Sequence, residues 1–299
     1  MLHSRMLTYL DEVARAGSVR KAAERLNVSP TAVNRQVLLL EEAMGEPLFQ
    51  RLPRGMKLTA AGEVVIEHVR RTMRDYRRIS ERLETMRGLG GNEVRIATMN
   101  GLVSGAVPRV LQEFAADHPH VRVSCRTAFI RDIVQQVLDG ESDIGLGYNL
   151  PQDPQLTVHR SYEAPLGVVV SPDHPLARRG QLRPSDCLPY PLILPDETLR
   201  MHRVIRDCFL AAGAEIRPSY QTNSIDMMRQ MALTSDGLCF LPAFDVAPEL
   251  AERRLVHIPL ADRAMAANRL MLMTRRGQVL GPVTLTFMDR LMQYLDACD

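Results

Sequence analysis

The chain has 299 residues, of which 45% are hydrophobic and 24% are charged, and its formal net charge is +2. Because this length exceeds that of one average domain, we expect two or three modules. No run approaches the roughly 18 apolar residues that a membrane-spanning helix needs, and charges interrupt residues 2–20 too often for a signal peptide. We therefore expect a cytoplasmic globular protein without a membrane partner.

Positive charge is concentrated toward the N-terminus. Residues 1–88 contain 16 Lys and Arg against 11 Asp and Glu, a balance of +5, whereas residues 89–299 contain 21 against 24, a balance of −3. This asymmetry indicates an anionic partner for the N-terminal module.

The cysteines show no pairing pattern. All five are scattered, with no Cys-x-x-Cys spacing, which predicts neither a disulfide framework nor a zinc site. We expect no metal site and no cofactor. A redox pair such as Cys187 with Cys208 stays open as an alternative, because the sequence does not show whether their Cα atoms approach within bridging distance.

Two amphipathic patterns meet near the N-terminus. Ser18 precedes apolar residues at helical spacing over residues 19–26, and Ser29 precedes a second such pattern over residues 30–44. Serine is a preferred helix N-cap, and Pro30 stands at the first helical position, where a missing N–H has little cost. The sequence therefore predicts two helices joined by a tight turn.

The second helix carries short polar and basic side chains on the face that its apolar stripe leaves free. Thr31, Asn34 and Arg35 lie there, close to the capping Ser29. A helix fits the DNA major groove, and polar side chains near its start reach base edges. We interpret the pair as a helix-turn-helix within residues 1–58; a solvated face on a helical bundle is the alternative.

Residues 47–58 read as two short strands around a Pro-Arg-Gly turn. Such a hairpin is typical of the wing of a winged helix. Arg51 and Arg54 would lie near its tip, where a phosphate backbone or minor groove would pass.

A long helix with a heptad stripe follows, within a linker segment of residues 59–88. Its apolar positions alternate spacings of four and three, which favours pairing with a second helix: Val65, Val69, Thr72, Tyr76, Ile79, Leu83 and Met86. Packing of the helix on its own domain is the alternative. Residues 89–92 are rich in glycine and are expected to form a hinge.

From residue 93 onward, strand-like and helix-like segments alternate. We expect strands at 93–99, 121–125, 143–148, 166–171, 192–194, 218–221, 238–241 and 269–274, and helices at 104–118, 130–139, 199–212, 224–233 and 282–297. Repeated βα units imply mainly parallel sheets flanked by helices. Extended segments near 162–165 and 263–268 suggest two lobes with a cleft between them: 93–162 with 268–299, and 163–267.

Ligands of open α/β sheets bind beyond the C-terminal ends of strands. This rule selects loops whose hydroxyl, amide and backbone N–H groups suit a small carboxylate or another polar acceptor, with two apolar walls. The selected effector residues are Thr98, Met99, Asn100, Gly101, Thr127, Phe129, Pro195, Thr222, Asn223 and Ser224. Simple helix capping is the alternative for each of them.

The N-terminal module resembles the DNA-binding end of LysR-type transcriptional regulators. The resemblance covers roughly 60 residues and rests on many fixed spacings: Leu7, Gly17-Ser18, Ala22-Ala23-Glu24-Arg25-Leu26, Ser29, Ala32-Val33, Arg35-Gln36, Leu40-Glu41-Glu42, Gly45, Pro47-Leu48-Phe49, Arg51, Leu58-Thr59 and Ala61-Gly62. Pro30-Thr31 and Asn34 depart from the family, which often has Gln-Pro after the capping serine and Ser at the latter position. The bases read are therefore not transferable, although Asn34 could contact adenine through two hydrogen bonds.

The resemblance implies a periplasmic-binding-protein-like effector domain of α/β fold and a homotetramer of paired dimers. We expect a regulator that binds double-stranded promoter DNA and responds to a small-molecule effector. The chain has no P-loop, GxSxG or HExxH motif, so we expect no enzyme. The alternatives are a thiol-based regulator, a solute-binding protein without a DNA role, and an enzyme fused to a helix-turn-helix.

Overall fold

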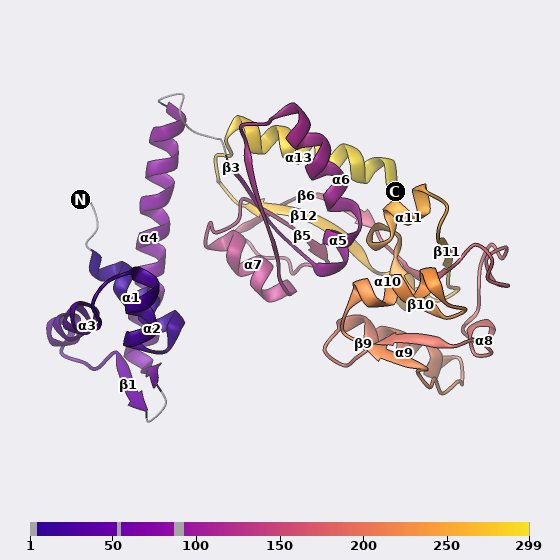
Figure 1. Ribbon diagram of the computed structural model, residues 1–299, viewed down its shortest axis with the longest axis horizontal. Helices are drawn as coiled ribbons and strands as arrows, with labels where there is room; N and C mark the ends of the chain where they lie inside the picture. The colour runs from indigo at the N-terminus through magenta and orange to yellow at the C-terminus, as the bar shows by residue number, and fades with distance from the viewer. Residues whose placement is uncertain (1–4, 53–54, 87–92, 299) are drawn as a thin grey trace. The chain divides into compact units, whose positions relative to one another are not determined.

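The computed structural model describes residues 5–52, 55–86 and 93–298, which belong to two compact units, Met1–Gly90 and Gly91–Asp299 (Figure 1). Each unit has its own core. Among the helices described, none is both long enough and apolar enough to cross a bilayer.

The first unit combines helices with one antiparallel hairpin. Its elements are α1 (Arg5–Ala16), α2 (Val19–Leu26), α3 (Pro30–Met44), β1 (Phe49–Leu52), β2 (Gly55–Leu58) and α4 (Ala60–Met86). The hairpin pairs Phe49 with Leu58. The core contains the apolar stripes of all four helices together with the start of the hairpin: Leu10, Val13, Ala22, Ala23, Val33, Val37, Leu40, Leu48, Phe49 and Ile66.

The helix ends follow the expected capping chemistry. The Ser18 side chain accepts a hydrogen bond from Lys21 N, and that of Ser29 accepts one from Ala32 N. Asn27 ends α2 with a φ of 53°, a left-handed conformation that asparagine tolerates better than most residues. Local chemistry therefore sets the tight turn between α2 and α3.

The start of α4 is fixed to the segment that precedes the hairpin. Thr59 donates a hydrogen bond from Oγ1 to Pro47 O (2.7 Å) and accepts one from Gly62 N (3.0 Å). A Cβ at Gly62 would lie 2.0 Å from Leu48 O, so only glycine permits this approach. Arg70 of α4 also forms an ion pair with Asp11 of α1 (2.7 Å).

The heptad stripe of α4 has two different environments. Its first part packs inside the unit: Val69 is buried and Val65 lies against the core. Val69 is therefore not available to a partner helix, because its own module already covers it. Farther along, Tyr76, Ile79 and Leu83 are 40%, 51% and 47% exposed.

The second unit contains two five-stranded sheets, each with helices on both faces. The first lobe, as defined here, is the sheet of order β4-β3-β5-β12-β6 and its helices. Its elements are β3 (Glu93–Thr98), α5 (Asn100–Ser104), α6 (Ala106–Asp117), β4 (Arg122–Thr127), α7 (Ile130–Leu138), β5 (Ile144–Tyr148), β6 (Leu156–Glu163), β12 (Arg269–Arg275) and α13 (Pro282–Cys298). Figure 1 shows α6 and α13 together over one face and α7 under the other.

The second lobe is the sheet of order β11-β7-β10-β8-β9 with its helices. Its elements are β7 (Leu166–Val170), α8 (Pro184–Cys187), β8 (Leu192–Pro195), α9 (Arg200–Ala211), β9 (Tyr220–Thr222), α10 (Ile225–Thr234), β10 (Leu238–Pro242), η1 (Ala243–Asp245), α11 (Ala247–Ala251), β11 (Val256–Pro259) and α12 (Arg263–Ala266). Along β10, Leu238 and Phe240 face one core and Cys239 and Leu241 face the other.

The sheets are mixed rather than mainly parallel. β5–β12 and β12–β6 pair antiparallel in the first lobe, and β11–β7 and β7–β10 do so in the second. The expectation of mainly parallel sheets failed for two reasons: the expected strands β12 and β7 run antiparallel to their neighbours β5 and β10, and the sequence interpretation missed the antiparallel edge strands β6 and β11. Part of the segment expected to be extended near 263–268 is the short helix α12.

The expected helix 104–118 is divided into α5 and α6 at Gly105. A Cβ at this position would lie 2.2 Å from Phe244 O, so the break lets the second lobe approach the first. The chain passes between the lobes from β6 to β7 and again from α12 to β12. The first sheet extends to Glu163, the last residue of β6, which pairs with Arg269.

Candidate DNA-binding surface and effector site

The start of α3 presents the side chains that the sequence singled out. Ser29 caps the helix through its hydroxyl (3.2 Å to Ala32 N), so its Oγ is already engaged. Thr31 and Arg35 are exposed, whereas Asn34 is half-buried. Val33 and Val37 lie in the core, which directs the polar face of the helix outward.

A hydrogen bond joins this face to the hairpin. Arg51 Nη2 of β1 donates to Asn34 Oδ1 of α3 over 3.3 Å. The carboxylate of Glu41 in α3 accepts hydrogen bonds from the backbone N–H groups of Leu48 (2.8 Å) and Phe49 (3.0 Å). These two bonds hold the start of β1 against α3. Arg54, the other expected wing residue, lies outside the described residues.

The expected effector residues of the first lobe follow β3. Thr98 is buried, and its Oγ1 has no hydrogen-bond partner within the described structure. Met99 Sδ accepts from Tyr148 N (3.2 Å). Asn100 is exposed at the start of α5, and Gly101 is buried next to the carboxylate of Asp245.

Two further first-lobe residues follow β4. Thr127 is exposed at the end of the strand, and Phe129 is 64% exposed at the N-cap of α7. An aromatic side chain this exposed does not form a closed apolar wall.

The expected effector residues of the second lobe surround the start of α10. Thr222 Oγ1 accepts from Ser224 N (3.1 Å), and Ser224 Oγ accepts from Met227 N (3.2 Å), so both hydroxyls serve as local caps. Asn223 between them is exposed. Pro195 is buried at the end of β8, where Asp196 N donates to Thr222 O.

An interlobe contact that the sequence interpretation missed lies next to these loops. The segment η1 of the second lobe reaches into the first lobe, where Phe244 belongs to the core and packs edge-on against Tyr162. Tyr148 OH donates to Asp245 Oδ1 over 2.6 Å. A Cβ at Gly101 would lie 2.4 Å from the carboxylate carbon of Asp245, so Gly101 leaves room for this group.

Burial raises the pKa of Asp245 from 3.8 to about 7, although the Tyr148 hydrogen bond and the positive charge of Arg229 act in the opposite direction. Burial also raises the pKa of Tyr148, and the neighbouring Asp245 raises it further, so the phenol remains a donor. A carboxylic acid within an apolar run, between Phe244 and Val246, is the sequence signal that could have identified this site.

Arg229 of α10 forms a second interlobe contact. Its guanidinium donates to Ser104 O of α5 (2.9 Å) and to Glu249 of α11 (2.8 Å), and it also pairs with Asp226. Because α5 and α10 pack together, Arg229 joins the two helices that start at Asn100 and just after Ser224.

Asparagines hold the two crossings between the lobes. Asn149 and Asn268 bond to each other through their side-chain amides. Asn268 Nδ2 also donates to Ala164 O (2.8 Å), and Arg269 N donates to Asn149 Oδ1 (3.0 Å). Both connecting segments are thereby tied to the end of β5.

The thiols give the redox alternative no support. All five cysteines are free, and Cys187 and Cys208 are buried in one core. Burial raises the pKa of each to about 12, so the reactive thiolate is scarce at neutral pH.

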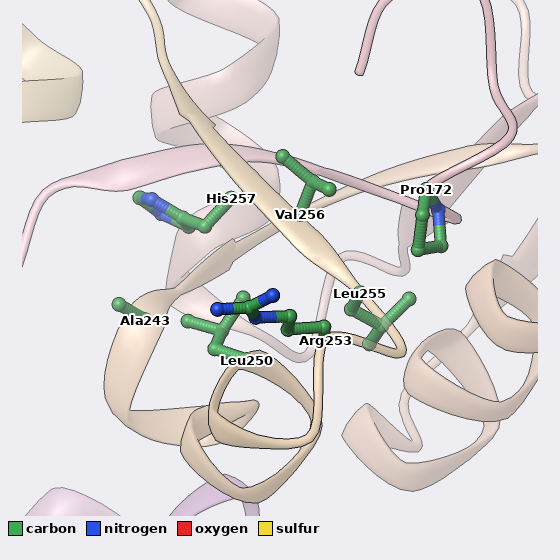
Figure 2. Close-up of a pocket in the computed structure, with 7 residues that line it drawn as sticks. All are labelled: Pro172, Ala243, Leu250, Arg253, Leu255, Val256 and His257. Carbon is green, nitrogen blue, oxygen red and sulfur yellow. The ribbon is translucent and has the colours of Figure 1, made fainter. Parts of the chain in front are cut away.

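In the described residues, no group of three or more His, Cys, Asp or Glu side chains is placed to hold a metal ion. Figure 2 shows a cavity of about 500 Å³ in the second lobe, and none of the expected effector residues lines it.

Two parts of the chain match known protein families. Residues 4–63 match the family described as bacterial regulatory helix-turn-helix protein, lysR family. Residues 87–296 match the LysR substrate binding domain.

Curated relatives align along nearly the whole chain. The SDS degradation transcriptional activation protein of a Pseudomonas species is 30% identical over 288 residues, 93% of this chain and 92% of the relative. The RuBisCO operon transcriptional regulator of Allochromatium vinosum is 27% identical, over 95% of this chain and 94% of its own.

Solved structures share the fold. Full-length CbnR in complex with its target DNA superposes with a TM-score of 0.63 at 21% identity, over 97% of this chain and 99% of CbnR. Full-length OxyR from Pseudomonas aeruginosa superposes with a TM-score of 0.67 at 17% identity, over 99% of this chain and 96% of OxyR.

The buried Asp245 predicts a specific dependence of stability on pH. Its pKa is higher in the folded chain, about 7, than the usual 3.8, so the folded state binds the extra proton in this window. Protonated Asp245 therefore adds to the free energy of unfolding. This contribution is complete below pH 3.8 and is lost as pH rises to about 7, by about 1.4 kcal/mol per pH unit. Asp245→Asn should remove this slope.

Urea unfolding at intervals from pH 5 to pH 8 measures the difference. The stability of Asp245→Asn relative to wild type should rise with pH up to about 7 and then level off. Asp289→Asn, at an exposed position of α13, serves as the control and should follow wild type. Parallel profiles for wild type and Asp245→Asn would show that the buried carboxyl does not titrate in this range.

Proposed function

This chain belongs to the LysR family of DNA-binding transcriptional regulators with an effector-binding domain, and we propose that it reads promoter DNA through α3 and the β1–β2 hairpin. We propose further that its second unit senses a small polar or anionic metabolite at the loops that begin α5 and α10. The alternative of a solute-binding protein without a DNA role is thereby set aside.

The observation that supports the DNA surface is the Arg51–Asn34 hydrogen bond. It holds the hairpin against the polar face of α3, so that a base-reading helix and a phosphate-contacting strand form one surface. Thr31 and Arg35 remain exposed on that surface. We propose that Arg35 and Arg51 contact phosphates and that Thr31 and Asn34 face base edges.

Arg51→Ala should weaken binding to the target promoter and lower the slope of log K against log salt by about 0.9, the value for one lost phosphate contact. Arg35→Ala should weaken binding in the same way. Fluorescence anisotropy with promoter DNA at several salt concentrations measures both. Arg122→Ala, at a side chain 82% exposed in the other unit, is the matched control. An unchanged slope for Arg51→Ala would remove the hairpin from the interface.

The observation that supports the effector site is the packing of α5 on α10 with Arg229 between them. Asn100 is exposed at the start of α5 and Asn223 is exposed just before α10, and Thr98 adds a buried hydroxyl without a partner in the described structure. Amide and hydroxyl groups from both lobes at one place suit a small polar ligand that binds one interlobe arrangement better than another.

Asn223→Ala should impair the response to the effector but leave DNA affinity intact. A thermal-shift screen of small carboxylates identifies ligands that stabilise the wild type by mass action. Their stabilisation should fall in Asn223→Ala and persist in Gln135→Ala, an exposed amide on α7. If Asn223→Ala also loses DNA affinity, this residue has a structural role and does not contact the effector.

We propose that the exposed part of the α4 stripe pairs two copies of the chain. Tyr76, Ile79 and Leu83 supply the apolar side chains, since Val69 is already buried in its own unit. The family resemblance extends the proposal to a homotetramer, an assembly that would match paired DNA half-sites.

Leu83→Arg should dissociate the paired helix by placing charge in an apolar seam. Light scattering across a dilution series should show a lower mass for this variant. Val64→Arg, at a position of α4 that is 70% exposed and off the stripe, should leave the mass unchanged. Equal masses for Leu83→Arg and wild type would exclude this part of α4 from the interface.

We propose that the chain acts in the cytoplasm, where promoter DNA lies, and that it has no catalytic role. Its relatives are transcriptional regulators, which supports this proposal.

A further inference from the structure

The cavity of about 500 Å³ in Figure 2 is lined by apolar residues together with one arginine and one histidine. It is lined by Pro172, Ala243, Leu250, Arg253, Leu255, Val256 and His257. Its volume falls in the range of small-molecule sites, which are mostly apolar with a few polar groups that orient the ligand.

Arg253 occupies a backbone position at which glycine is the usual residue. Helix α11 ends with Arg254 N bonded to Glu249 O (2.8 Å) and Arg253 N bonded to Leu250 O (3.1 Å), the pattern of a Schellman motif. Arg253 takes the left-handed position of that motif, with a φ of 56°. A long side chain is disfavoured there relative to glycine, and such departures often mark functional positions.

The guanidinium of Arg253 faces the cavity without a counter-charge. Figure 2 shows its side chain lying over Leu250, with the guanidinium directed toward Ala243, while Pro172 and Leu255 lie at the opposite end. Among the described residues, Arg253 has no acidic partner, whereas the adjacent Arg254 pairs with Glu249 and Glu252.

His257 forms a wall of the cavity, and burial lowers its pKa, which favours the neutral ring. Its Nε2 donates to Leu241 O over 3.1 Å, since a carbonyl oxygen can only accept. A Cβ at Gly167 would lie 2.3 Å from this nitrogen, which shows how closely the ring packs on β7.

We propose that this cavity is a second ligand site, separate from the proposed effector site, for an amphipathic monoanion: a medium-length alkyl carboxylate whose head pairs with Arg253. The alkyl chain lies along Leu250 and Val256 toward Leu255 and Pro172. A guanidinium binds a carboxylate through two parallel hydrogen bonds, and the apolar walls remove the chain from water.

The site borders η1 and α11, the part of the second lobe that contacts the first lobe. Ala243 belongs to η1, whose Asp245 accepts from Tyr148 of the first lobe. Leu250 follows Glu249, which binds Arg229. A ligand in the cavity would therefore contact the outer side of the segment whose inner side holds the interlobe hydrogen bonds.

Isothermal titration of the full-length protein with octanoate tests the proposal. Arg253 is exposed, so Arg253→Gln should fold normally and bind octanoate at least about tenfold more weakly, as expected for a lost charge-assisted pair. Affinity should rise about fourfold per methylene from butanoate to octanoate. Octylamine, with the opposite charge, should not bind.

Asn223→Ala separates this site from the proposed effector site, because that variant should bind octanoate as wild type does. Binding that survives Arg253→Gln, or that is lost in Asn223→Ala, would overturn the proposal, as would equal binding of octylamine. Arg131→Gln, an exposed arginine on α7, is the matched control and should leave octanoate affinity unchanged.

Discussion

The insertion of η1 into the first lobe is the constraint on which the regulatory unit depends. Phe244 completes the core of a lobe to which its own sheet does not belong, and Asp245 is buried beside it against Tyr148. Gly101 and Gly105 make the insertion possible, since a side chain at either would collide with this segment. A carboxyl in such a position is unfavourable when ionised, so the contact is a place where a modest change in conditions or ligands can shift the balance between lobe arrangements.

The proposed ligand sites lie on two sides of this contact. Arg229 connects α5 and α10 to Glu249 of α11, and the proposed effector residues lie at the starts of α5 and α10. The cavity beside Arg253 is lined in part by Ala243 of η1 and Leu250 of α11. A ligand regulates only if its affinity differs between two states, and here each site contacts an element that bridges the lobes. The proposed DNA-binding surface belongs to the first unit, where the Arg51–Asn34 hydrogen bond joins α3 to the hairpin.

Much of the fold could be predicted because it depends on local chemistry. Ser18, Ser29 and Thr59 each precede a helix that follows their capping preference. The strands β6 and β11 were missed because edge strands bury few side chains and so carry weak alternation: in β6 only Leu156 and Tyr162 are buried. The Tyr148–Asp245 pair joins residues 97 positions apart, which no local pattern reveals. The left-handed backbone at Arg253 contradicts the residue's own preference, so only the structure could identify it.

The attachment of α4 to the hairpin limits how the first unit can respond to regulation. Thr59 bonds to Pro47 O, Gly62 touches Leu48 O and Arg70 pairs with Asp11, so the helix start, the wing and α1 are held together at several points. A torque on α4 would have to break these contacts before it could change the conformation of the first unit. We therefore expect the first unit to turn as a rigid body. If two copies pair through α4 as proposed, regulation would change the spacing of the two proposed DNA-binding surfaces along the double helix while the base contacts of each surface stay the same.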